Sequence, residues 1–367
     1  MAMGIEIGDT KQLVPGPRIP SKCRVMRSNN NLDVALHNGR LWLAWRTSPN
    51  HFAGSESLVN IISSPDMGET WEFEKVISPD RDLREPRFLL WDEQLFLYWF
   101  EAGTSPVKFE PGRIFATRRG SDGWSEPVAI SEPGYVVWRP RVIAGRALMS
   151  VYSGGETIYT NHPRPTEVEI WESSDGFHWA PIQGERRAVH TGGTETDYAL
   201  LNDGGLLAVT RKEGPHGGWG TDVCRSDAHD WTRWRFESDR RKLDSPLMFA
   251  HAGRYFVIAR RQAGLSGNYD LGLRSLPQVL RTRLFQAAYW VTPKRTALWE
   301  VDPETLTIEW LADLPSRGDT AFAGIVEVGT GEWLVYNYSS PLEERDRVWI
   351  DGQLSATNIY VTQLRIN

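Results

Sequence analysis

Six copies of one pattern run along the sequence, and this repetition constrains the fold more than any other feature. Each copy has a polar opening, a turn and apolar strand segments on either side of the turn. The copies span residues 27–46, 83–101, 138–152, 194–211, 243–260 and 319–338. A unit that recurs at roughly fifty-residue spacing is typical of an array that closes as one body. We therefore predict an all-β fold, a six-bladed β-propeller of four-stranded antiparallel blades that takes up residues 1–367 as a single domain.

The composition agrees with many short strands joined by glycine turns. The chain has 17 tryptophans and 33 glycines, and few stretches follow the period of a helix. Most of the aromatic side chains are expected to fill the wedges between blades. The proline-rich segment 1–22 is predicted to be an extended arm, and 358–366 a final strand. The two ends are expected to share a blade, because this closes the ring without an exposed edge.

Charge and cysteine content exclude several classes of function. The formal net charge of −6 argues against the basic surface that nucleic-acid binding requires. Cys23 and Cys224 are far apart and lack metal-ligand spacing, so we predict no disulfide, metal or cofactor. No segment has the length and apolarity of a membrane span or signal peptide, which makes the cytoplasm the default location and leaves secretion open. The oligomeric state is left open.

One turn sequence recurs along the chain. In SSPDMGETW, residues 63–71, Asp66 can accept hydrogen bonds from backbone amides, Gly68 can take a positive φ, and Trp71 can pack under the turn. The segment 173–179 repeats this sequence closely, and less regular versions span residues 120–124, 225–231 and 301–310. These turns resemble the Asp boxes of the sialidase superfamily, whose members are six-bladed propellers. The resemblance implies a turn between the third and fourth strands of a blade, and by itself implies no chemistry.

The same resemblance implies a site at the centre of one face. A sialidase site has three arginines for the substrate carboxylate, a tyrosine nucleophile paired with a glutamate, and an aspartate acid/base. By position, Glu195 resembles the glutamate and Arg211 the second arginine. Arg27 resembles the first arginine, and Arg295 the third. Two further candidates for the third arginine are Arg260 and Arg261.

Two chemical groups of the sialidase pattern are missing from this sequence. Phe322, which has no hydroxyl group, stands where the resemblance places the tyrosine nucleophile. The segment 47–62 should hold the acid/base aspartate, but its only candidates are His51 and Glu56. A retaining mechanism through tyrosine is therefore not expected.

The openings of the six repeats are rich in charged residues. They contain Arg27, Arg84, Glu85, Arg87, Arg139, Arg141, Glu195, Asp197, Asp244 and Asp319, and Arg211 arrives on a neighbouring strand. Because strand ends converge on the axis of a propeller, these groups are expected to crowd one funnel. Crowded carboxylates beside guanidinium groups can have pKa values that are pushed apart, and arginine suits a carboxylate ligand. We predict that the funnel binds an acidic or otherwise polar sugar.

The first hypothesis is a glycoside hydrolase that works by carboxylate acid/base chemistry, with inversion as its natural mechanism. We assign catalysis to Glu195 together with one of Asp319, Asp244 or His51. We assign substrate binding to Arg27, Arg211, Arg295, Arg84, Glu85, Arg139, Asp197 and Phe322. The structural alternatives are an ion pair for Glu195, turn-forming roles for the two aspartates, and a solvated loop for His51.

Two other hypotheses stay open. In a polysaccharide lyase, arginines would neutralise a uronate carboxylate while His51, Tyr198 or Tyr269 abstracts the adjacent proton. In a carbohydrate-binding propeller without activity, the missing tyrosine and aspartate would mean that the chemistry has been lost.

Overall fold

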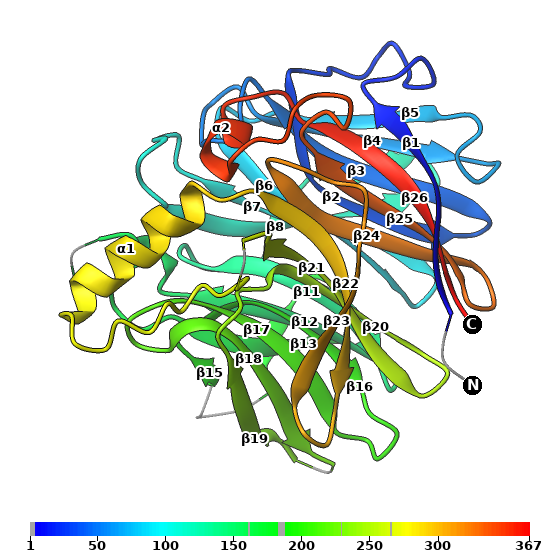
Figure 1. The fold of residues 1–367 in the computed structure, drawn as a ribbon. Helices are drawn as coiled ribbons and strands as arrows, with labels where there is room; N and C mark the ends of the chain where they lie inside the picture. Colours follow the sequence, from blue (N-terminus) through cyan, green and yellow to red (C-terminus); the bar gives the residue numbers. More distant parts are fainter. Residues whose placement is uncertain (1–3, 161, 183–187, 229, 265) are drawn as a thin grey trace.

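A computed structural model describes residues 4–160, 162–182, 188–228, 230–264 and 266–367. Its strands form six antiparallel sheets arranged as the blades of a propeller, which confirms the predicted fold class (Figure 1). Blade one is built from β2 (Ser28–His37), β3 (Arg40–Ser48), β4 (Leu58–Ser64) and β5 (Glu72–Ile77). Blade two is built from β6 (Asp82–Trp91), β7 (Gln94–Ala102), β8 (Pro111–Gly120) and two short outer strands, β9 (Gly123–Trp124) and β10 (Val128–Ala129).

The next three blades follow the same plan. Blade three has β11 (Val136–Ile143), β12 (Arg146–Ser153), β13 (Glu167–Ser173), β14 (Trp179–Pro181) and β15 (Ala188–Thr191), with a 3-10 helix at Gly155–Thr157. Blade four has β16 (Gly193–Leu200), β17 (Leu206–Gly214), β18 (Gly218–Asp227) and β19 (Asp230–Asp239). Blade five has β20 (Asp244–His251), β21 (Arg254–Gln262), β22 (Lys294–Asp302) and β23 (Thr307–Asp313).

Blade six joins the two ends of the chain. It contains β24 (Thr320–Gly329), β25 (Glu332–Ser339), β26 (Asn358–Ile366) and, outermost, β1 (Ile5–Val14), which pairs antiparallel with β26. The shared blade was predicted, but the arm contains a regular strand that was not. The strand segment IEIGDTKQLV contains no proline, and the first proline of the arm, Pro15, comes directly after the strand.

Each predicted repeat supplies the two inner strands of one blade. The innermost strands are β2, β6, β11, β16, β20 and β24, and each contacts the innermost strands of both neighbouring blades. Aromatic side chains fill the wedges as expected. For example, Trp42 of blade one meets Trp124 of blade two edge to face, with ring centroids 5.7 Å apart.

The recurring turns join the third and fourth strands of their blades. Asp66 accepts hydrogen bonds from the Thr70 backbone N–H at 2.8 Å and from the Thr70 hydroxyl at 2.6 Å, and Gly68 has a φ of 98°. In the matching turn, Asp175 accepts from the backbone N–H groups of Phe177 and His178. The turn predicted at 225–231 includes residue 229, which lies outside the described residues.

Two α-helices in the described part of the chain depart from the strand repeat. Helix α1 (Gln278–Trp290) is inserted between the second and third strands of blade five, and helix α2 (Trp349–Gln353) precedes the last strand of blade six (Figure 1). No helix in the described part of the chain has the length and apolarity to cross a membrane.

Candidate functional site

The innermost strands are irregular near their openings, and this irregularity sets the direction of the site residues. All six show a register shift against the second strand of their blade. Four of these shifts contain a non-glycine residue of positive φ: Asn31 at 41°, Glu85 at 56°, Ser245 at 56° and Phe322 at 47°. A bulge re-aims its side chain, and strained backbone of this kind clusters at functional sites.

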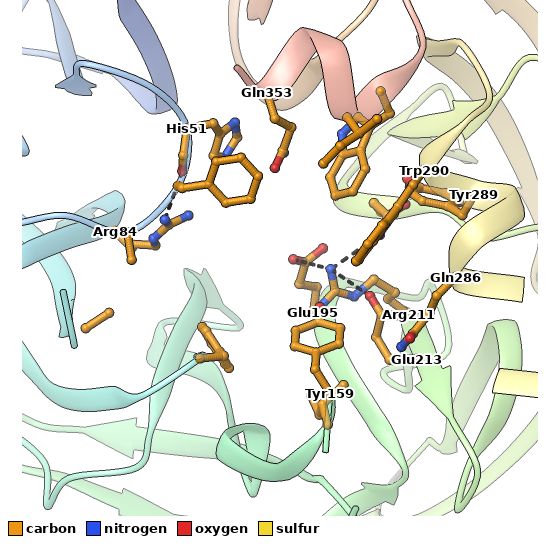
Figure 2. A pocket seen from close by; sticks show the side chains of 18 of the residues that line it. His51, Arg84, Tyr159, Glu195, Arg211, Glu213, Gln286, Tyr289, Trp290 and Gln353 are labelled. Carbon is orange, nitrogen blue, oxygen red and sulfur yellow. Dashed lines mark hydrogen bonds and ion pairs between the residues drawn. The ribbon is translucent and has the colours of Figure 1, made fainter. Parts of the chain in front are cut away.

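A cavity of about 490 Å³ lies where these innermost strands begin. Its deep part is charged: Glu85, Glu195 and Arg211 line it, and each is at most 7% exposed. Its rim is apolar and open, with Tyr159 56% and Trp290 45% exposed. Figure 2 shows side chains that reach the cavity from strands, from loops and from both helices. A polar floor beneath an apolar rim is common in sites for small molecules.

Glu195 and Arg211 form the centre of a compact charged cluster. The hairpin of β16 and β17 brings them together, and Arg211 Nη1 lies 2.7 Å from Glu195 Oε1. The same nitrogen lies 3.3 Å from Asp244 Oδ1 and 3.5 Å from Glu213 Oε1. The other Glu195 oxygen accepts the backbone N–H of Ser245 at 2.7 Å. Burial raises the pKa of Glu195, and Arg211 opposes this while Asp244 adds to it.

Asp244 is the ionised partner within this cluster. Lys242 Nζ lies 3.2 Å from its Oδ1 and 2.6 Å from Glu213, and Arg260 Nε lies 3.6 Å from its Oδ2. The Tyr289 hydroxyl donates a hydrogen bond to Asp244 and accepts one from Arg260 at 3.0 Å. Although burial raises the pKa of Asp244, Lys242, Arg260 and Arg211 hold it well below its usual range. The turn-forming alternative does not apply to Asp244, because side chains bind its carboxylate.

Glu85 has the opposite protonation preference. Burial raises its pKa from 4.5 to about 8, with Arg87 lowering it and Glu195 raising it further. Asn31 donates a hydrogen bond to Glu85 Oε1 at 3.1 Å, whereas Oε2 has no hydrogen bond and lies 3.5 Å from Arg87 Nη2. Glu85 therefore carries a proton at neutral pH. Two carboxyl groups of one cavity, Glu85 and Asp244, have pKa values pushed in opposite directions.

His51 is buried rather than solvated. Its Nδ1 lies 2.5 Å from Asp319 Oδ2, and Asp319 also accepts hydrogen bonds from the Tyr338 hydroxyl at 3.2 Å and from Trp349 Nε1 at 3.1 Å. Burial lowers the pKa of His51 below 6.5 despite the opposing effect of Asp319. Arg84 Nη2 donates to the His51 carbonyl at 3.0 Å. Asp319 thus stands behind His51 and does not itself line the cavity.

Four predicted substrate-binding residues lie outside the cavity lining. Arg27 is exposed ahead of β2, and Arg295 pairs with Asp346 at 2.6 Å. Asp197 comes two residues after Glu195 on β16, about 7 Å further along the strand, where it pairs with Arg139 and Arg141. The expectation of a shared funnel is therefore wrong for Arg27, Arg139 and Asp197, and Arg295 does not reach the cavity either. Three other members of the expected funnel also lie outside the lining, namely Arg87, Arg141 and Asp319.

The remaining predicted residues, except Asp319, come together. Arg84, Glu85, Arg211, Asp244, Glu195, His51 and Phe322 all line the cavity. The Phe322 ring packs against Trp138, with centroids 5.5 Å apart. Of the two tyrosines considered as bases, Tyr269 lines the cavity and Tyr198 does not. The functional role of each residue stays a prediction.

Sequence reasoning missed Glu213, Lys242 and the residues of helix α1. The helix supplies Gln286, Tyr289 and Trp290 to one side of the cavity, opposite His51 and Arg84 (Figure 2). Its only signal in the sequence was that the fifth and sixth repeats are separated by the longest interval in the series. Within the described residues, no group of three or more His, Cys, Asp and Glu side chains has a geometry that could hold a metal ion.

Comparison with known proteins identifies the fold. No protein-family model matches the sequence, and no curated protein matches it. A Dyadobacter fermentans protein of unknown function is similar in structure, with a TM-score of 0.66 and 14% identity over 99% of this chain and 100% of that one. For a Trypanosoma rangeli sialidase in complex with sialic acid, the TM-score is 0.64 and the sequence identity is 13%, over 96% of this chain and 58% of the sialidase. For the phage phi92 endosialidase, the TM-score is 0.61 and the sequence identity is 11%, over 98% of this chain and 69% of the endosialidase. At this identity the comparisons show a sialidase-like propeller fold and no activity.

Proposed function

We propose that this protein is a glycoside hydrolase that cleaves a polar sugar residue in the cavity by proton transfer between its own side chains. One observation carries the proposal. A carboxylic acid that keeps its proton at neutral pH, Glu85, lines the same cavity as Glu195 and as a neutral imidazole held by a carboxylate, His51. Groups whose pKa values are pushed apart are what acid/base catalysis requires.

Each of the three groups has a distinct role in this mechanism. Glu85 donates its proton to the glycosidic oxygen as the bond to the sugar carbon breaks. His51 takes a proton from the water that attacks the same carbon. Glu195, held by Arg211 and by the Ser245 N–H, in its ionised form stabilises the positive charge that develops on the sugar. Because water attacks directly, the configuration at the sugar carbon inverts.

The hydrogen bond between His51 and Asp319 supports the role of the imidazole. The pKa of Asp319 lies below its usual range because, against the effect of burial, His51 and Arg260 stabilise the carboxylate. An ionised carboxylate only accepts hydrogen bonds, so Nδ1 of the neutral His51 carries the hydrogen. Nε2 then keeps a lone pair and is the atom available to receive a proton.

A panel of aryl glycosides tests the proposal directly. The panel contains glycosides of sialic acid, glucuronic acid and several neutral sugars, and release of the aryl alcohol reports hydrolysis. At least one member should be cleaved by the wild type and lost with Glu195→Gln. Glu172→Gln is the matched control, because Glu172 of β13 pairs with Arg146 of β12 and neither residue lines the cavity. Sugar binding by calorimetry with no product after prolonged incubation would favour a binding propeller instead.

A polysaccharide lyase is the second candidate, and the position of Arg84 beside His51 supports it. The Arg84 guanidinium lies at the cavity wall and donates to the His51 carbonyl. There it could neutralise a uronate carboxylate while neutral His51 removes the adjacent proton. A lyase forms an unsaturated product that absorbs in the near ultraviolet, whereas hydrolysis forms none. Absorbance measured on uronate-containing polysaccharides therefore separates the two reactions.

A further inference from the structure

The positive charges that line the cavity are already paired with acids of the protein. Arg211 contacts three carboxylates, and Lys242 contacts two of the same three. Arg84 Nε lies 2.5 Å from Asp82 Oδ2. Among the described cations of the lining, Lys108 alone has no acidic partner, and it is exposed on the rim.

Arg260, the remaining cation of the lining, is compensated in the same way. It lies 3.6 Å from Asp244 and 3.8 Å from Asp319, and it donates hydrogen bonds to the Tyr289 hydroxyl and the Thr320 carbonyl. A substrate carboxylate would therefore enter a site whose cations are neutralised. It would lose its hydration without gaining an unpaired buried cation, and this costs free energy in the low dielectric of a buried site.

Among the described residues of the lining, the buried polar atoms that lack a hydrogen-bond partner belong to uncharged groups. Glu85 Oε2 belongs to a carboxyl group that is protonated at neutral pH, and Gln286 Nε2 belongs to an amide. Both atoms are buried and make no hydrogen bond within the described part of the chain. The guanidinium nitrogens without a hydrogen bond on Arg87 and Arg139 lie outside the cavity lining. A sugar hydroxyl both donates and accepts, so it suits a protonated carboxyl group and an amide together.

From these two patterns we propose that the cavity selects an uncharged sugar residue and disfavours sialic and uronic acids. The hydroxyl groups of the sugar bind Glu85 and Gln286, and its ring faces Trp290 and Tyr159 at the rim. This inference rests on the proposed function, because it takes the cavity to be the sugar-binding site. Its test measures binding and therefore does not depend on turnover.

The first experiment compares the binding of methyl thioglycosides, which resist hydrolysis. Calorimetry on the wild type uses the galactose, arabinose and rhamnose derivatives as the neutral set. The glucuronic acid and sialic acid derivatives are the acidic set. At least one neutral derivative should bind at least about tenfold more tightly than both acidic ones, because an unfavourable charge contact costs at least that much affinity. Tighter binding of an acidic derivative, or no binding by any neutral one, would overturn the inference.

The second experiment removes one of the compensating acids. Glu213→Gln leaves Arg211 and Lys242 with one carboxylate fewer, so affinity for the acidic derivatives should rise about tenfold. Affinity for the neutral derivatives should change far less. Glu172→Gln, which removes an acid of β13 outside the cavity lining, should alter neither set, and thermal melting checks that both variants fold. A Glu213→Gln variant that gains no affinity for acids would contradict the charge argument.

The outcomes separate this inference from the proposed function. Cleavage of an aryl sialoside or glucuronide in preference to neutral aryl glycosides would support hydrolysis and overturn the selection for uncharged sugars. Binding of neutral thioglycosides without cleavage of any aryl glycoside would keep the selection and remove the hydrolase.

Discussion

Two charged clusters sit inside the same ring of strands and have different consequences. The cavity cluster contains Glu195, Arg211, Glu213, Lys242 and Asp244, and it faces open space. The inner cluster contains Asp33, Arg139, Arg141 and Asp197, and none of its members lines the cavity. Both clusters are largely buried, and both combine arginines with acids.

The inner cluster ties blades to one another. Asp33 of β2 accepts from the Phe88 backbone N–H of β6 at 2.9 Å and pairs with Arg139 of β11 at 3.2 Å. Asp197 of β16 pairs with Arg141 and accepts from the Met248 N–H of β20 at 2.7 Å. These carboxylates are therefore used in holding five adjacent blades together. A high density of charged residues at the start of the innermost strands does not by itself indicate a catalytic site. The cavity cluster differs from the inner cluster because open space lies beside its charged groups.

The largest expected effect on activity comes from the cavity cluster. Glu195→Gln keeps the size and one acceptor of the side chain but cannot carry negative charge. We expect turnover to fall by about a hundredfold or more, a typical effect of losing a catalytic carboxylate, and thermal melting checks that the variant still folds after Arg211 loses one of its three carboxylate partners. Kinetics on the best aryl glycoside measure this, with Glu172→Gln as the control. Turnover equal to that of the wild type would remove Glu195 from the mechanism.

The pH dependence of turnover should report the other two groups. The mechanism needs His51 neutral and Glu85 protonated, and it also needs Glu195 ionised. Activity should fall on the acid side below pH 6.5, where His51 gains a proton, and on the alkaline side near pH 8, where Glu85 loses one. Glu85→Gln should lower turnover and abolish the alkaline fall, and His51→Asn should lower turnover and leave on the acid side only the fall caused by protonation of Glu195, whose pKa burial raises. If both variants kept the wild-type profile, these two assignments would be wrong.

A substitution in the inner cluster should lower the stability of the protein and leave turnover nearly unchanged, unlike a substitution in the cavity cluster. Asp197→Asn removes a buried charge that pairs with two arginines, so the free energy of unfolding should fall by about 3–5 kcal/mol. Turnover per folded molecule should change little, since Asp197 is outside the cavity lining. Denaturant unfolding and active-site titration measure the two quantities separately. A large loss of turnover at unchanged stability would show that the two clusters do not divide in this way.

The sequence was sufficient to predict the six-bladed ring and the contact at the centre of the site. Six repeats and the turn at 63–71 predicted the blades, and the hairpin pattern predicted that Glu195 and Arg211 would meet. Position within a repeat was not sufficient to place Asp197, because one more step of two residues along a strand moves a side chain from the cavity into the inner cluster. Helix α1 could not be predicted, since an insertion follows no rule of the repeat.

The smallest expected effect tests the contribution of that insertion to the cavity. Trp290 ends helix α1 and is 45% exposed at the rim, where its ring can pack on a sugar. Losing one aromatic contact is worth about 0.5–1.5 kcal/mol, so Trp290→Ala should raise KM roughly two- to tenfold with kcat nearly unchanged. Trp310→Ala is the matched control, because Trp310 is 47% exposed on β23 and lies outside the cavity lining. Equal effects of the two substitutions on KM would mean that helix α1 covers the cavity without binding the substrate.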